Sequence, residues 1–203
     1  MATVLDAYSH IGFTCIMSSL ERVRLEIRNA LLRPDRITPV VETEGEVDPM
    51  RIYTRSPLPG GRHPAKVMLF APRIAPQTSV LFANYEDGWP TLAVCTSMRI
   101  PEPVYRFALS TDDDEWPKNL FEILDGGVTR RHVSILKDVD RWVFWQKGEP
   151  IAEEDVEEYR NRRIRHRLTR EYLVSLATRL HFPIADDGFW ESDSEAVYFE
   201  EQR

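Results

Sequence analysis

The charged residues near the C-terminal end of this chain are sorted into blocks. An acidic stretch at 153–158 is followed by six arginines at 160–170, and then by a segment at 183–203 in which every charged side chain except Arg203 is acidic. A strong anion and a strong cation therefore lie close together in the sequence, and each could attract an oppositely charged partner. The two blocks could also neutralise each other within the molecule.

The acidic segment is the candidate docking surface for another protein, and its charge would suit a basic one. Its candidate contact residues are four acids and one aromatic side chain: Asp186, Asp187, Glu191, Asp193 and Trp190. Seven acids at 186–201 exceed what the nearby arginines can pair, so we expect this segment to stay mostly exposed. Surface charges of this kind accelerate association with a basic partner more than they stabilise a fold.

The arginine block offers an alternative site that binds anions. Arg160, Arg163, Arg167 and Arg170 are spaced by three, four and three residues, which places them on one face of a helix. Such a face could follow the phosphates of a nucleic acid or hold a nucleotide phosphate. The sequence favours a blander interpretation, in which these arginines pair with Glu157, Glu158, Glu171 and the acidic segment. A net charge of −7 and a pI near 5.3 also argue against nucleic-acid binding.

No residue pattern predicts catalysis, a metal site or a cofactor. None of the five histidines has a partner at metal-ligand spacing, and Cys15 and Cys95 lie far enough apart to be free thiols. Cys95 is expected in the middle of a strand, where a cysteine is usually inert. The acids at 112–115 could hold a hard cation, but a loop before a helix is the favoured interpretation. An enzyme of unrecognised type would have a pocket converging on Cys95, His132 or this acidic loop.

These observations favour a non-enzymatic protein-interaction module, either an adaptor or an inhibitor of the immunity-like type. The start of the sequence lacks the pattern of a signal peptide, and no apolar run approaches the roughly 18 residues of a membrane span. Together with the free cysteines, this predicts a cytoplasmic protein that has no membrane association.

The elements that would position these residues predict an α+β fold. With 42% hydrophobic and 29% charged residues, the 203-residue chain is expected to form a single globular domain. An amphipathic helix is predicted at 19–33, followed by a proline-rich loop at 34–65 with short edge strands at 40–42 and 51–54. Four runs typical of strands then predict a meander, at 66–73, 78–85, 91–98 and 104–110. The dipeptide Asp87-Gly88 predicts a tight turn between the second and third of them.

The rest of the chain predicts a short helix, a hairpin and a broken helix. Pro117 and Gly126-Gly127 bracket the expected short helix. The hairpin joins 131–137 to 141–147, and Trp142 and Trp145 on its second strand face opposite ways, so only one of them should be substantially accessible. The region 153–182 is expected to be helical with a break near Thr169, and a final hairpin or edge strand follows within the acidic segment at 183–203. The predicted sheet has about six antiparallel strands, packed with an N-terminal helix and C-terminal helices.

Overall fold

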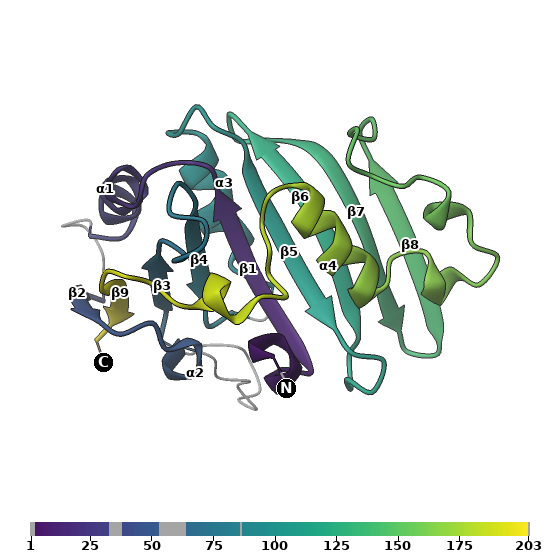
Figure 1. Cartoon of the computed structure of the whole chain (residues 1–203), viewed down its shortest axis with the longest axis horizontal. Coiled ribbons are helices and arrows are strands. Elements are labelled where there is room, and N and C mark those ends of the chain that lie inside the picture. Colours follow the sequence, from purple (N-terminus) through teal and green to yellow (C-terminus); the bar gives the residue numbers. More distant parts are fainter. Residues whose placement is uncertain (1–2, 33–37, 53–63, 86, 203) are drawn as a thin grey trace.

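The computed structural model describes residues 3–32, 38–52, 64–85 and 87–202. Its strands form a nine-stranded antiparallel sheet in the order β2-β9-β3-β4-β1-β5-β6-β7-β8 (Figure 1). The strands are β1 (His10–Ile16), β2 (Val40–Gly45), β3 (Lys66–Phe70), β4 (Ser79–Ala83), β5 (Val104–Ser110), β6 (Lys118–Asp125), β7 (Val128–Asp138), β8 (Arg141–Lys147) and β9 (Ala196–Glu201). The α+β class is confirmed, but the sheet has nine strands where about six were predicted.

Helices cover both faces of this sheet. The α-helices are α1 (Leu20–Leu31), α2 (Pro49–Ile52), α3 (Pro90–Ser97) and α4 (Arg170–Arg179), and the 3-10 turns are η1 (Val4–Ala7), η2 (Glu158–Arg160), η3 (Ile164–His166) and η4 (Asp187–Trp190). Helix α1 confirms the N-terminal helix predicted at 19–33. Helix α4 begins at the expected cap, since the Thr169 hydroxyl accepts a hydrogen bond from the Tyr172 N–H at 3.1 Å.

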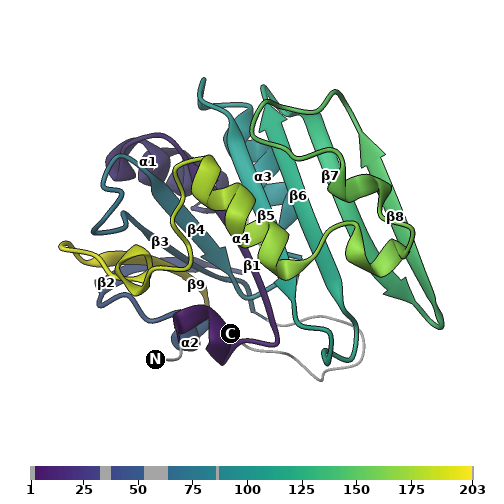
Figure 2. The ribbon, with the colours of Figure 1, turned by 45° about the vertical axis from the view of Figure 1, so that its right-hand side comes forward.

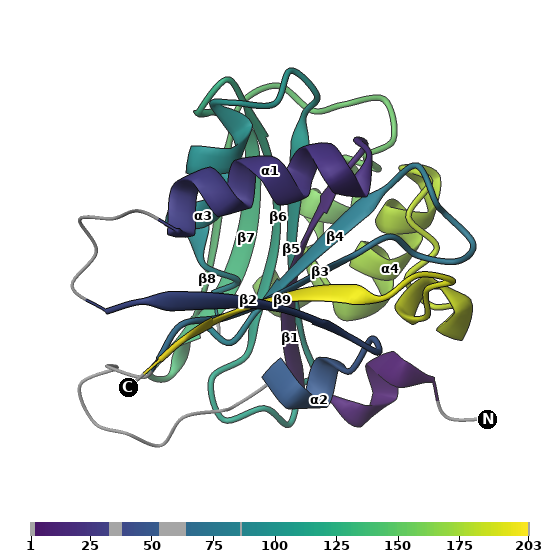
Figure 3. The same cartoon turned by 90° about the vertical axis from the view of Figure 1, so that its left-hand side faces the viewer.

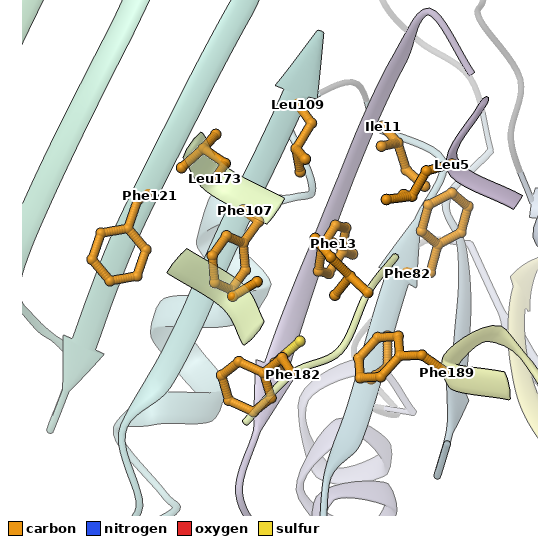
Figure 4. Close-up of a cluster of buried hydrophobic side chains, with 14 of the residues drawn as sticks. Leu5, Ile11, Phe13, Phe82, Phe107, Leu109, Phe121, Leu173, Phe182 and Phe189 are labelled. Atoms are coloured by element: carbon orange, nitrogen blue, oxygen red, sulfur yellow. The ribbon is translucent and has the colours of Figure 1, made fainter. Parts of the chain in front are cut away.

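The sheet separates two hydrophobic cores. Helix α4 lies across β5 and β6, and the turns η2 and η3 lie over β8 on the same side (Figure 2). Helices α1 and α3 pack on the other side, so α3 and α4 face each other through the sheet (Figure 3). The larger core lies on the α4 side, where Phe13, Phe107 and Phe121 from neighbouring strands pack in a row, with ring centroids 5.4 and 5.5 Å apart (Figure 4).

Two strands went unrecognised in the sequence because they are buried on both faces. All seven residues of β1 are buried at the centre of the sheet, so its sequence shows no alternation. The segment predicted as a short helix after Pro117 is the strand β6, with Phe121 in one core and Leu124 in the other. Gly126 and Gly127, with φ of 57° and 80°, form the tight turn from β6 to β7 and do not end a helix.

The third strand of the predicted meander is wrong, because residues 90–97 form the helix α3. Pro90 occupies the first turn of this helix, a position at which its fixed φ and missing N–H cost nothing. The buried residues Leu92, Ala93, Thr96 and Ser97 repeat at helical spacing. The hairpin predicted to turn at Asp87-Gly88 therefore does not exist, and these residues lead from β4 into α3.

Gly88 nevertheless adopts the backbone conformation that the turn prediction required. Its φ is +69°, which β-branched residues rarely adopt. We expect Gly88→Val to lower the free energy of unfolding by about 1 kcal/mol or more. Urea denaturation of both proteins would measure the difference, and equal stability would show that this backbone conformation is not required.

The proline-rich segment is described only in part, because residues 33–37 and 53–63 lie outside the described ranges. The predicted edge strand at 40–42 is confirmed by β2, but residues 51 and 52 belong to the short helix α2 and not to a strand. The final strand β9 is not at an edge, since it pairs with β2 on one side and β3 on the other. Within the described ranges, no helix combines the length and apolar character needed to span a bilayer.

Candidate docking site and polar row

The acidic segment at 183–203 is built into the fold. Its strand β9 places Val197 and Phe199 in the core on the α1 side, and Tyr198 in the core on the α4 side. The backbone of this segment is therefore held in place, while the side chains of Asp186, Glu191, Asp193 and Glu195 remain exposed. The acids that could meet a partner project from a rigid support.

Trp190, the aromatic member of the predicted docking residues, is mostly buried in the core. Its side chain is 3% exposed, its indole N–H donates to the Ile184 carbonyl at 2.8 Å, and its ring meets Phe13 edge-on. Burial of this large apolar ring stabilises the fold more than a contact on the open surface would. It therefore anchors the segment in the core, and the neighbouring acids supply the exposed charge.

Asp186 and Asp187 have local structural roles. The Asp186 carboxylate caps η4 by accepting a hydrogen bond from the Gly188 N–H at 2.9 Å. The Asp187 carboxylate accepts from the Val4 N–H at 2.8 Å and ties the segment to η1. Any substitution at these two positions would disturb backbone contacts as well as surface charge.

Beside η4 the surface is hollowed by a cavity of about 450 Å³. Its wall contains four acids, one arginine and four other residues: Glu46, Glu191, Asp193, Glu195, Arg73, Val47, Trp190, Ser192 and Ser194. Arg73 makes an ion pair with Glu191, at 2.5 Å, so one of the four carboxylates is neutralised inside the wall. No local sequence signal pointed to Glu46 or Arg73, because both come from segments more than 100 residues away from the acidic segment.

The four arginines of the alternative anion site do not share a helix face. Arg160 lies in η2, Arg163 precedes η3, Arg167 follows it and Arg170 begins α4, because the predicted first half of the helix consists of separate 3-10 turns. The sequence pattern there fits no continuous apolar stripe, and the chain instead follows β8.

Three of these arginines have partners within the molecule. Arg160 pairs with Glu157 at 2.6 Å, as expected, but on the exposed surface. Arg167 donates to the Asn161 carbonyl at 2.9 Å and lies over the ring of Phe144. Arg170 donates to two backbone carbonyls near η1, and burial lowers the pKa of its guanidinium. Arg163 is exposed.

The other chemical candidates do not converge. Cys95 is partly exposed on α3, whereas Cys15 is buried in β1, where burial raises the pKa of the thiol well above its usual value. Among the described residues, no group of three or more His, Cys, Asp or Glu side chains could hold a metal ion. Asp114 of the acidic loop at 112–115 accepts a hydrogen bond from the Trp116 N–H at 2.8 Å, a local turn contact.

A row of polar side chains crosses the sheet on the α3 side. The strand register aligns Arg106 on β5, Glu122 on β6 and His132 on β7. Arg106 donates to one oxygen of Glu122, and the His132 Nδ1 lies 3.2 Å from the other. Burial opposes the charge of Glu122, but the contacts with His132 and Arg106 outweigh it and hold the pKa of this carboxyl below its usual value.

The hydrogen bonds of this row have the order found in a hydrolase triad. The His132 Nε2 lies 3.0 Å from the Ser134 Oγ, so serine, histidine and carboxylate follow one another. Acyl transfer also requires donors aimed at the oxyanion. Ser134 lies within a strand that pairs on both sides, with Leu120 and with Trp145, so the neighbouring backbone N–H groups serve the sheet. The backbone N–H groups beside Ser134 are therefore not available to an oxyanion, and the row is better explained as a means of fixing side chains on this face.

Comparison with known proteins gives no relative. No protein family matches the chain, and neither the curated proteins nor the solved structures contain a significant match.

Proposed function

We propose that this chain is a non-enzymatic protein-interaction module, an adaptor or an inhibitor of the immunity-like type, that docks a basic partner at the acidic hollow. The observation that carries this proposal is the charge of the wall, where four carboxylates surround a single arginine. Three of these carboxylates, those of Glu46, Asp193 and Glu195, are exposed and make no ion pair with another described residue. An arginine or lysine of a partner would meet unneutralised charge on a preformed surface.

The fold supports docking because residues 191–195 of the hollow lie between two elements that are anchored in the core, η4 and β9. Trp190 and β9 fix the segment from below, so binding would order few backbone residues and would cost little conformational entropy. The cavity volume also falls within the usual range of binding pockets, about 300–1,000 Å³. The partner would insert a basic side chain and would be steered by the surrounding acids.

Reversal of the three unpaired charges should slow association strongly. We expect Glu46→Lys, Asp193→Lys and Glu195→Lys together to reduce the on-rate for the partner by roughly 10- to 100-fold at low salt, and less at high salt. Parallel affinity purification with the native and the reversed protein as baits would identify partners retained only by the native surface. Stopped-flow or surface plasmon resonance measurements would then give the on-rates.

A matched variant controls for net charge. Glu115→Lys, Asp140→Lys and Glu149→Lys change the charge by the same amount at exposed positions away from the hollow. This control should bind nearly as fast as the native protein. Equal on-rates for the native protein and the hollow variant at low salt would refute docking at the hollow. Because surface pairs contribute only about 0–1 kcal/mol each, both variants should fold.

A further inference from the structure

A second surface lies on the α3 side of β7 and β8, at the edge of the sheet. Val143 and Trp145 of β8 are 45% and 49% exposed there, whereas Trp142 points to the opposite face and packs partly buried against the larger core. The expectation that only one of the two tryptophans is substantially accessible is confirmed. Helix α3 packs on β5 and β6, further from this edge.

The exposed ring of Trp145 is held by the polar row. The His132 ring meets it edge-on with centroids 4.6 Å apart. Both nitrogens of that imidazole have partners, Glu122 at 3.2 Å and Ser134 at 3.0 Å, and Glu122 is itself fixed by Arg106. These contacts hold the indole of Trp145 in place before any ligand binds. Binding would therefore cost little side-chain conformational entropy.

Basic side chains surround this indole although the whole chain is acidic. Alternation along β8 puts Arg141 and Lys147 on the same face as Trp145, and the register of β6 with β7 adds Lys118. Asp138, opposite Arg141, is the acid that the same register places on this face of β7. Glu122 is buried and already paired with Arg106. The face is thus locally positive, in contrast to the net charge of −7.

We propose that this face binds single-stranded nucleic acid, with a base stacked on Trp145 and the backbone phosphates near Lys147, Arg141 and Lys118. A braced aromatic ring with cations on either side is the arrangement by which proteins bind single strands without reading their sequence. A duplex would offer phosphates but no free base face to the indole. An acidic peptide would satisfy the charges but would leave the ring without a planar partner.

The test is fluorescence anisotropy with a labelled single-stranded oligothymidine of about ten nucleotides at low salt. Trp145→Ala should weaken binding roughly 5- to 100-fold, since stacking on an aromatic residue contributes that much per base, and Trp145→Phe should recover part of the loss. With three phosphate contacts, the logarithm of the association constant should fall with the logarithm of salt concentration with a slope of about −2. Lys147→Ala should make that slope shallower by about 0.7.

The matched control is Arg163→Ala, an exposed cation on the segment that covers the opposite face of β8. This variant should bind as tightly as the native protein. Loss of binding on Arg163→Ala but not on Trp145→Ala or Lys147→Ala would overturn the proposal in favour of the arginine segment. No binding by the native protein, or tighter Trp145-dependent binding of a polyglutamate peptide than of the oligonucleotide, would also overturn it.

Discussion

Replacing Glu154 by Gln should lower the free energy of unfolding by about 3–5 kcal/mol, although Glu154 is a contact residue of neither proposed site. Its side chain has no exposed surface, and its carboxylate faces Arg131, whose side chain is 2% exposed. The guanidinium reaches the carboxylate through two nitrogens, at 2.9 and 2.7 Å. An amide would leave this buried cation without a counter-charge, which is costly in a low-dielectric interior.

The remaining bonds of this pair explain why a charge is tolerated there. Arg131 also donates to the Gly148 carbonyl at 2.8 Å, and the Tyr159 hydroxyl donates to Glu154 at 2.6 Å. Burial, followed by the contact with Glu154, raises the pKa of Tyr159, so its hydroxyl keeps its proton and remains a donor. The polar groups of this cluster therefore find their hydrogen-bond partners only in the folded protein, because the partners come from separate segments of the chain.

Equilibrium urea denaturation of the native protein and of Glu154→Gln measures the difference in their free energies of unfolding directly. The matched variant replaces both charges, with Arg131→Met and Glu154→Leu, and should be less destabilised than the single substitution because no unpaired charge remains. A single variant as stable as the native protein would show that water or another group already compensates Arg131. Equal losses in the single and double variants would assign the effect to packing and not to charge.

This cluster also marks how far the sequence could predict the structure. The hairpin from 131 to 147 was predicted from two apolar runs joined through 138–140, and β5 was predicted at its observed bounds. The pairing of Arg131 with Glu154 was not predicted, because the acids at 153–158 were assigned to the first half of a helix broken near Thr169. The helix prediction rested on charges that are neighbours in the sequence, whereas the fold buries one of these acids, Glu154, against Arg131 of β7.

The errors in the sheet have a common physical origin. Alternation is visible only where one face is covered, so β1 and β6, which are covered on both faces, carried no strand signal. For residues 90–97 the short apolar run fitted either a strand or a helix, and Pro90 was the residue that distinguished them. Whether a short buried segment forms a strand or a helix is therefore determined by the elements that pack on it.

The candidate site was predictable only in its local part. The exposed acids Glu191 and Asp193 were identified from charge alone, but Glu46 and Arg73 join them through the pairing of β2 and β3 with β9. Burial of Trp190 could not be inferred from its acidic neighbours. Likewise, the strand pattern predicted one accessible tryptophan on β8, but the His132 contact that braces Trp145 depends on the register of β7 with β8.

Replacing Gly148 by Ala should also destabilise the protein strongly, by about 2–5 kcal/mol. Gly148 has a φ of +81°, and an added Cβ would lie 1.9 Å from the carbonyl oxygen of Arg130, a backbone atom that cannot rotate away. Relief of this clash requires β7 and the end of β8 to separate. The same movement would carry the Gly148 carbonyl away from Arg131, so the buried ion pair would be weakened as well.

Gly126→Ala is the matched control, because Gly126 also has a positive φ, +57°, but an added Cβ meets nothing within 4 Å. It should cost only the backbone strain, about 1–2 kcal/mol. Thermal and urea unfolding of both variants would compare the two costs. If Gly148→Ala is no more destabilising than Gly126→Ala, the backbone contact between Gly148 and Arg130 does not constrain the fold. The two stability losses can also be compared in a background that carries Arg131→Met and Glu154→Leu. If they become equal only there, the clash acts through the ion pair. The close approach at Gly148 then serves to position Arg131.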